Sequence, residues 1–150
     1  MLQRYNIQFN SDIYALASLQ EWFLQFQNFL PKTVWMQCNL VLVEIFTNVV
    51  SYAHDGLDVK TPIDIELDIN TDENLLELKI WDYGQPFDPV AEVERLSKEA
   101  QKNRDFENID DIPTGGRGLI IAKMIADNIH YESISDGRNC FVMTKSFDPK

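Results

Sequence analysis

Cysteine is scarce in this sequence and long apolar runs are absent, and each absence excludes a class of protein. The two cysteines, Cys38 and Cys140, lie far apart and match neither a disulfide framework nor the spacing of a metal site. No run of about 18 apolar residues is present, so we expect no membrane-spanning helix. The N-terminal residues MLQRYNIQF lack the basic start and the apolar centre of a signal peptide. We therefore expect a cytoplasmic protein whose cysteines are reduced residues of the core.

Positive charge is also scarce. The 150 residues include 13 Lys and Arg against 24 Asp and Glu, which gives a formal net charge of −11 at pH 7. Nucleic acids and anionic membranes are bound through clustered Lys and Arg, so we expect neither as a partner. The length and the 45% of hydrophobic residues are typical of one folded domain with a core of its own.

The spacing of apolar residues predicts alternating groups of helices and strands. In chain order we expect a strand at 5–9, helices at 13–30 and 32–53, strands at 63–69 and 76–80, a helix from about 119, and strands at 129–134 and 140–147. Strands that follow one another through short polar turns form antiparallel hairpins. The order therefore predicts an α+β two-layer sandwich, in which helices cover one face of a mostly antiparallel sheet.

The most apolar segment, LVLVEIFTNVVSYAH, carries one carboxylate and one amide at helical spacing. Glu44 is the only formally charged side chain between Lys32 and Asp55, and Asn48 follows it after about one helical turn. Their oxygen atoms would suit Mg²⁺ and its water ligands. The same residues also fit the solvated side of an amphipathic helix. This segment alone leaves both interpretations open.

A second candidate segment, WDYGQPFDP, follows the return strand of the first predicted hairpin. Gly84 and Pro86 break the strand, so Asp82 is the last residue that the sheet would hold firmly. Its carboxylate could accept a hydrogen bond from an amino group of a ligand, while Gly84 would let a flat ring approach. The alternative is a turn in which Asp82 binds backbone amides, because Asp and Gly are common in such turns.

A third candidate segment, PTGGRGLIIAK, places glycines directly before the predicted third helix. Exposed N–H groups at a helix N-terminus form a site for anions such as phosphate. No Gly-Lys-Ser/Thr follows, so the segment is not a P-loop, and it does not follow a strand as a dinucleotide fingerprint does. A flexible linker that leads into a helix is the alternative.

Taken in this order, the three segments resemble the N, G1 and G2 boxes of the GHKL ATPase superfamily. The segments EIFTNVVSYA, DYGQPFDP and GGRGLIIAKMIAD are most similar to the anti-sigma factor serine kinases of the RsbW and SpoIIAB type. The resemblance extends from about residue 11 to residue 147 and implies a single domain over residues 1–150. It further implies a bacterial protein with the Bergerat fold, a mixed, mostly antiparallel sheet, and a mobile ATP lid at about residues 89–114.

The resemblance also implies roles for individual residues. Glu44 would be the general base that takes the proton of the attacking hydroxyl, and Asn48 would coordinate Mg²⁺. Asp82 would accept a hydrogen bond from the adenine amino group of ATP. The remaining implied cofactor-binding residues are Gly84, Gly116, Arg117, Gly118 and Thr144. Gly84 would allow close approach, Gly116 and Gly118 would line the phosphates, and Thr144 would help to fix the adenine. Arg117 would lie beside the phosphates, and a surface charge is the alternative for it.

One residue departs from the pattern of the superfamily. Many members have glycine where this sequence has Pro86. Proline lacks an N–H and has a fixed φ, so it predicts a stiffer floor of the pocket. This departure puts turnover in doubt rather than nucleotide binding.

The function implied by the resemblance is that of an ATP-dependent protein serine/threonine kinase with anti-sigma activity. Such a protein phosphorylates a STAS-type antagonist and otherwise holds a sigma factor or a similar regulator inactive. The alternative is a nucleotide-responsive interaction module with little or no kinase activity, because the motifs describe the pocket and not the acceptor. A sensor histidine kinase is not expected, since neither His54 nor His130 lies in a helical phospho-acceptor segment.

A homodimer is a further expectation. The anti-sigma kinases act as homodimers, and the first predicted helix is rich in aromatic residues. These are Trp22, Phe23, Phe26 and Phe29. Ordinary packing into the core is the alternative for this set.

Overall fold

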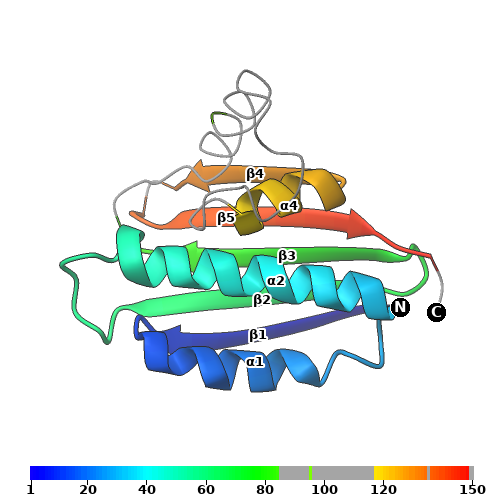
Figure 1. The fold of residues 1–150 in the computed structure, drawn as a ribbon, viewed down its shortest axis with the longest axis horizontal. Coiled ribbons are helices and arrows are strands. Elements are labelled where there is room, and N and C mark those ends of the chain that lie inside the picture. Colours follow the sequence, from blue (N-terminus) through cyan, green and yellow to red (C-terminus); the bar gives the residue numbers. More distant parts are fainter. Residues whose placement is uncertain (85–94, 96–116, 135, 149–150) are drawn as a thin grey trace.

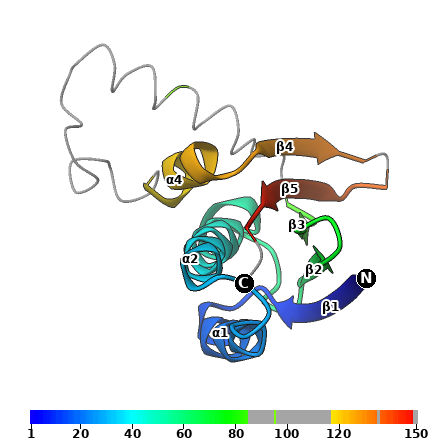
Figure 2. The ribbon, with the colours of Figure 1, turned by 90° about the vertical axis from the view of Figure 1, so that its right-hand side faces the viewer.

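The computed structural model describes residues 1–84, 95, 117–134 and 136–148. They form two layers, a five-stranded sheet and a layer of helices on one of its faces (Figures 1 and 2). The strands lie in the order β1-β2-β3-β5-β4. The elements are β1 Leu2–Asn10, a 3₁₀ turn Ile13–Ala15, α1 Leu16–Leu24, α2 Lys32–Asn48, a π-helical turn Val49–Ala53, β2 Pro62–Asn70, β3 Leu75–Asp82, α4 Arg117–Ile125, β4 Asn128–Ser133 and β5 Asn139–Ser146.

The predicted α+β sandwich is confirmed, with one difference in the sheet. Every pair of neighbouring strands in the described part of the chain is antiparallel, where a mixed sheet was expected. The first pair explains how this arises. Two helices connect β1 to β2 and together return the chain to the end of the sheet that it left, so Asn10 pairs with Pro62. Antiparallel pairing follows because β2 then runs back along β1.

Alternation along β2 and β3 separates a dry face from a wet one, as predicted. Ile63, Ile65 and Leu67 are fully buried beneath the helices, and the carboxylates between them lie on the other face. Side chains of a strand point alternately to the two faces of its sheet, so a strict alternation of this kind excludes a shift of the strand by one residue.

Helix α2 is the centre of the core. Residues 32–53 form one continuous helical stretch of 22 residues with a mean hydropathy of 1.3, and by length and composition alone this stretch could cross a membrane. In the fold it lies between α1 and α4 and packs on the sheet (Figure 2). Its buried residues are Val34, Cys38, Val41, Leu42, Ile45, Phe46 and Asn48. Burial on several sides therefore explains why this helix is so apolar.

The cysteines are core residues, as predicted. Cys38 in α2 and Cys140 in β5 are both buried and unbonded. Burial raises the pKa of each thiol to about 12. Neither thiol therefore forms the reactive thiolate near neutral pH.

The first helix is shorter than the predicted span of residues 13–30. It begins after a 3₁₀ turn capped by Asp12, whose side chain accepts a hydrogen bond from the Tyr14 N–H at 3.0 Å. It ends at Leu24, and a series of tight turns carries the chain on to Pro31. These turns place Phe26 and Leu30 in the core, so the apolar spacing continued beyond the helix itself.

The aromatic residues of this region serve the core more than the surface. Phe23 and Phe26 are fully buried, and Trp22 packs against Phe26 with ring centroids 5.0 Å apart. Phe29 is the exception, with 45% of its surface exposed. Core packing therefore accounts for most of the set, and the homodimer stays a prediction.

Candidate functional site

The candidate site lies where α2 and β3 end at the same side of the molecule. After Asn48 the helix widens into a single π-helical turn, closed by the N–H of His54 donating to the carbonyl of Val49 at 2.8 Å. Such turns are rare in proteins, and those that do occur often lie at functional sites. Here the turn brings the backbone of Ala53 against Gly84, two residues beyond the end of β3.

Asp82 is the central charged group of the site. It is the last residue of β3 and only 4% exposed. Its Oδ1 accepts two hydrogen bonds of 2.9 Å, one from the Gly84 N–H and one from the Asn139 side-chain amide. Its Oδ2 takes part in none of the hydrogen bonds found among the described residues. Gly84 and Asn139 thus hold one oxygen of the carboxylate and fix its orientation.

Asn139 is the residue that the sequence analysis missed. It is 2% exposed and begins β5 directly opposite Asp82. Its Nδ2 donates to Asp82 and also to the Gly84 carbonyl at 2.9 Å, and its Oδ1 accepts from the Ser133 hydroxyl at 2.8 Å. The amide therefore uses both its donor and its acceptor side to connect β3, β4 and β5. In the sequence it is only the last residue of a polar turn.

Thr144 does not lie beside Asp82, although the resemblance assigned it to the same adenine site. It pairs with Glu77 on β3, and its hydroxyl donates to the Asn128 carbonyl at 3.4 Å. It is five positions along β5 from Asn139, which corresponds to roughly 16 Å and to the opposite face of the sheet. Asn139 holds the position beside Asp82 that was expected for Thr144.

Gly84 allows a close approach, but the approaching group is the protein's own backbone. A Cβ atom at this position would overlap the carbonyl group of Ala53 and would lie 3.0 Å from its Cα. Any side chain here would push the π-helical turn away from the end of β3. Gly84 therefore sets the spacing between the two elements that form the site.

His54 is buried beside the site, in the turn that follows the π-helical residues. It is 3% exposed, and its Nε2 accepts a hydrogen bond from the Tyr83 N–H at 2.9 Å. Burial lowers the pKa of His54 below its usual 6.5, and the nearby charge of Asp82 opposes part of this shift. A proton on Nε2 would face the Tyr83 N–H and break the bond, so the neutral ring is the form that fits. His54 therefore has a structural role at the end of α2.

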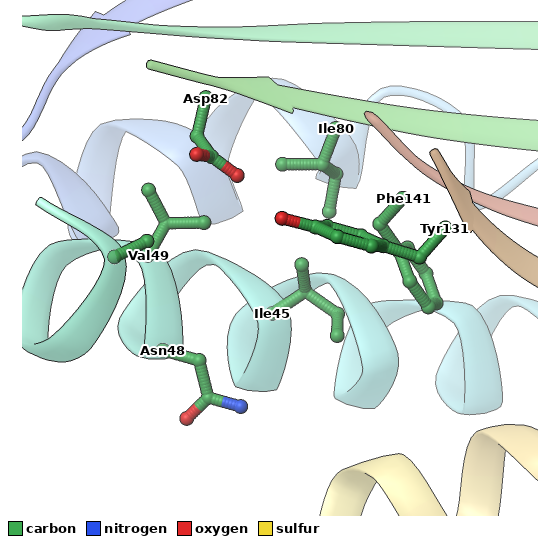
Figure 3. Close-up of a pocket in the computed structure, with 8 residues that line it drawn as sticks. Ile45, Asn48, Val49, Ile80, Asp82, Tyr131 and Phe141 are labelled. Carbon is green, nitrogen blue, oxygen red and sulfur yellow. The ribbon is translucent and has the colours of Figure 1, made fainter. Parts of the chain in front are cut away.

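A narrow pocket opens between the end of α2 and the sheet, next to Asp82 (Figure 3). Apolar side chains form most of its wall, and the Asp82 carboxylate points into it. Its cavity volume is about 20 Å³. The lining residues are Ile45, Asn48, Val49, Ala53, Ile80, Asp82, Tyr131 and Phe141. Apolar walls with a few polar groups are typical of sites for small organic ligands.

Asn48 lies at the rim of this pocket and points away from Asp82 (Figure 3). It is 7% exposed, and its Nδ2 has no hydrogen-bond partner within the described part of the chain. Glu44 lies one turn earlier on α2 and is half-buried. A solvated helix face does not account for a buried amide with unused hydrogen-bonding capacity, so this alternative is excluded for Asn48.

The described residues offer no cluster of three or more His, Cys, Asp or Glu that could hold a metal by itself. Mg²⁺ commonly keeps several waters and binds to ligand phosphates with one or two protein oxygens. The unpartnered atom of Asn48 is its Nδ2, which could donate to a phosphate oxygen or to a water bound to the metal but cannot bind Mg²⁺ itself. The side-chain oxygen of Asn48 would be the ligand that the chain contributes.

The phosphate-binding prediction falls largely outside the described residues. Gly116 and the lid predicted at residues 89–114, except for Arg95, belong to the undescribed part. Helix α4 begins at Arg117 and continues through Gly118, so the glycines do lead into a helix. This helix packs along α2. The side chain of Arg117 is not described, and the roles of Arg117, Gly116 and Gly118 stay predictions.

Comparison with known proteins agrees with this geometry. The fold is a two-layer α+β domain with a pocket beside a carboxylate at the end of a strand. The family model for the histidine kinase-like ATPase domain matches residues 9–145, and the chain belongs to that family. This confirms the predicted resemblance to the GHKL superfamily.

The fold is also found in a solved structure. A chain in the crystal structure of the SiaB–SiaC complex from Pseudomonas aeruginosa superposes with a TM-score of 0.62, covering 94% of this chain and 89% of its own length. The two sequences are 14% identical, so the similarity is one of fold. No curated protein sequence matches the chain.

The contact at Gly84 leads to a prediction about stability. We expect Gly84→Ala to lower the free energy of unfolding by about 3 kcal/mol or more, because its Cβ meets rigid backbone. Gly56→Ala is the control: Gly56 has a φ of +83° but open space around it. Its cost should be about 1–2 kcal/mol from backbone strain alone. Urea denaturation measures both, and equal losses would contradict the close contact.

Protonation of His54 leads to a second prediction. Because the pKa of His54 is lowered in the folded protein, the unfolded chain binds the proton more tightly. The neutral ring therefore makes its full contribution to folding stability above the unfolded pKa of about 6.5. Stability should be lost as the pH falls from there through the folded pKa. In His54→Gln the amide oxygen can accept from Tyr83 without titrating, so this loss should be smaller. Urea denaturation of both proteins between about pH 5 and 8, the range in which histidine commonly titrates, measures this loss. Parallel curves of stability against pH would contradict a buried neutral ring.

Proposed function

We propose that this chain binds Mg-ATP in the pocket beside Asp82 and uses it to control a second protein. The observation that carries the proposal is the state of the Asp82 carboxylate. Its Oδ1 is occupied by Gly84 and Asn139, whereas its Oδ2 accepts no hydrogen bond from the described residues. A fixed acceptor at the end of an apolar pocket suits the amino group of a purine. Membership of the histidine kinase-like ATPase family supports ATP as the ligand.

We further propose that the reaction is phosphoryl transfer to a serine or threonine of a STAS-type antagonist protein. The bond between the β,γ-bridging oxygen and the γ-phosphorus breaks while the acceptor hydroxyl oxygen bonds to that phosphorus. Glu44 takes the hydroxyl proton, and ADP leaves. Bound Mg²⁺, with Asn48 as the chain's ligand, would neutralise charge on the phosphates. In its other nucleotide state the protein would hold a sigma factor or a similar regulator.

A module that responds to nucleotide with little or no transfer is the second candidate. The small cavity favours it, because a volume of about 20 Å³ does not hold a nucleotide base and the site must rearrange before one enters. A switch requires such a coupling of nucleotide binding to rearrangement. The fold similarity to a chain of a two-protein complex is compatible with either candidate.

The geometry at Asp82 allows a test of nucleotide binding with little structural change. In Asp82→Asn the retained oxygen can still accept from Gly84 and Asn139, while the new amide group presents a donor where Oδ2 was. We expect Mg-ATP affinity to fall by about tenfold or more, from loss of a hydrogen bond to a charged group. Isothermal titration calorimetry measures the dissociation constants.

Two further variants make the binding test specific. Asn139→Ala should weaken binding in the same direction, because the carboxylate loses its orienting amide. Thr144→Ala should leave the affinity unchanged, because Thr144 lies on the other face of the sheet. Circular dichroism verifies that each variant is folded. Unchanged affinity in folded Asp82→Asn would rule out Asp82 as the ligand acceptor.

The kinase and the module differ in what Glu44 does. If Glu44 is the base, Glu44→Gln should reduce phosphate transfer by about 10²–10⁴-fold while ATP affinity stays the same. The measurement is transfer of the radiolabelled γ-phosphate to the STAS-type protein of the same organism. Glu73→Gln, in the exposed turn between β2 and β3, is the matched control. No transfer by the wild-type protein, combined with normal ATP binding, would favour the module.

A further inference from the structure

We propose that Tyr131 is an internal plug of the nucleotide pocket, and that its ring must leave before the base of a nucleotide can enter. The inference rests on the proposed function and adds a control of that same site. It assigns a role to a residue on β4, which none of the three sequence motifs includes.

The position of Tyr131 is set by the edge of the sheet. Tyr131 pairs with Phe141 on β5, and both side chains line the pocket. The Tyr131 ring extends across the pocket between the side chains of Ile45 and Ile80 (Figure 3). Its hydroxyl points toward the Asp82 carboxylate (Figure 3). The ring is half-buried and packs against the hydrophobic core.

This placement imitates a bound base in two respects. A flat aromatic ring lies between the aliphatic side chains of Ile45 and Ile80, where a purine would make the same contacts. The polar end of that ring is directed at Asp82, as the amino group of a purine would be. The slot therefore holds a ring and a polar group that come from the protein itself.

The volume left in the pocket decides whether a base could bind beside the Tyr131 ring or only in its place. With the ring in place, the cavity volume is about 20 Å³. That is enough for about one or two waters and not for a second ring system. A base and the Tyr131 ring therefore cannot share the slot, and binding requires the ring to be displaced.

Displacement of the ring is compatible with its position in the fold. In the described sheet β4 is an edge strand, and β5 is its only neighbour. A tyrosine there can turn outward by rotation of its side chain without breaking a strand pair. If the open form makes up about 0.1–10% of the molecules, the plug weakens the apparent affinity for nucleotide by about 10- to 1000-fold.

The test compares two substitutions that separate the ring from its hydroxyl. Tyr131→Val removes the ring and keeps a residue suited to a strand. Tyr131→Phe keeps the ring and removes the hydroxyl. We expect Mg-ADP to bind Tyr131→Val at least about tenfold more tightly than the wild type, and Tyr131→Phe to bind within about threefold of the wild type. Calorimetry on the full chain measures all three dissociation constants.

The outcomes separate the plug from the proposed function. Weaker or equal binding by Tyr131→Val, with clear binding by the wild type, would overturn the plug and leave nucleotide binding intact. Binding by Tyr131→Val alone would support both. Absence of binding in all three proteins, at nucleotide concentrations in the millimolar range, would overturn the proposed function itself.

A second measurement needs no substitution and applies if Tyr131→Val fails to fold. Tetranitromethane nitrates accessible tyrosines, and peptide mass spectrometry reports the extent at Tyr131. If ADP expels the ring, nitration of Tyr131 should increase in the wild-type protein with saturating Mg-ADP. Unchanged or reduced nitration would show that the ring stays in place and would overturn the plug.

Discussion

The hydrogen bonds that hold one oxygen of the Asp82 carboxylate are the interaction on which the site depends. A buried carboxylate without partners costs several kcal/mol, so the fold must supply donors to this position. Gly84 supplies a backbone N–H and Asn139 supplies a side-chain amide, and both reach the same oxygen. The second oxygen is thereby aimed at the pocket. The hydrogen bonds that stabilise the buried carboxylate thus also fix the direction of its second oxygen.

The rest of the architecture brings those donors together. β3 lies in the interior of the sheet, between β2 and β5. The π-helical turn at the end of α2 lets Ala53 touch Gly84, and it buries His54 against the backbone of Tyr83. These contacts leave no space for a Cβ at Gly84, so the end of α2 and the end of β3 are packed backbone against backbone beside the pocket.

Much of the fold could be read from local patterns. The alternation at residues 63–69 predicted a strand with one buried face, and that strand is β2. The lone carboxylate and amide in an apolar helix left a functional and a solvated face open, and the structure places Asn48 of α2 at the rim of the pocket. Asn139 could not be found in this way. It meets Asp82 across 57 positions of sequence, through a strand pair whose register no local pattern specifies.

The sequence by itself determined the order of helices and strands, the apolar character of α2, and the carboxylate at the end of β3, because these depend on neighbouring residues and on periodicity. Only the tertiary structure decided which residue holds that carboxylate and what fills the pocket. Thr144 and Asn139 are both polar residues of β5, but they differ by an odd number of positions and face opposite sides of the sheet. Tyr131 likewise reaches the pocket because β4 pairs beside β5. Contacts of this kind arise from strand pairing between distant segments, and local physical chemistry does not specify them.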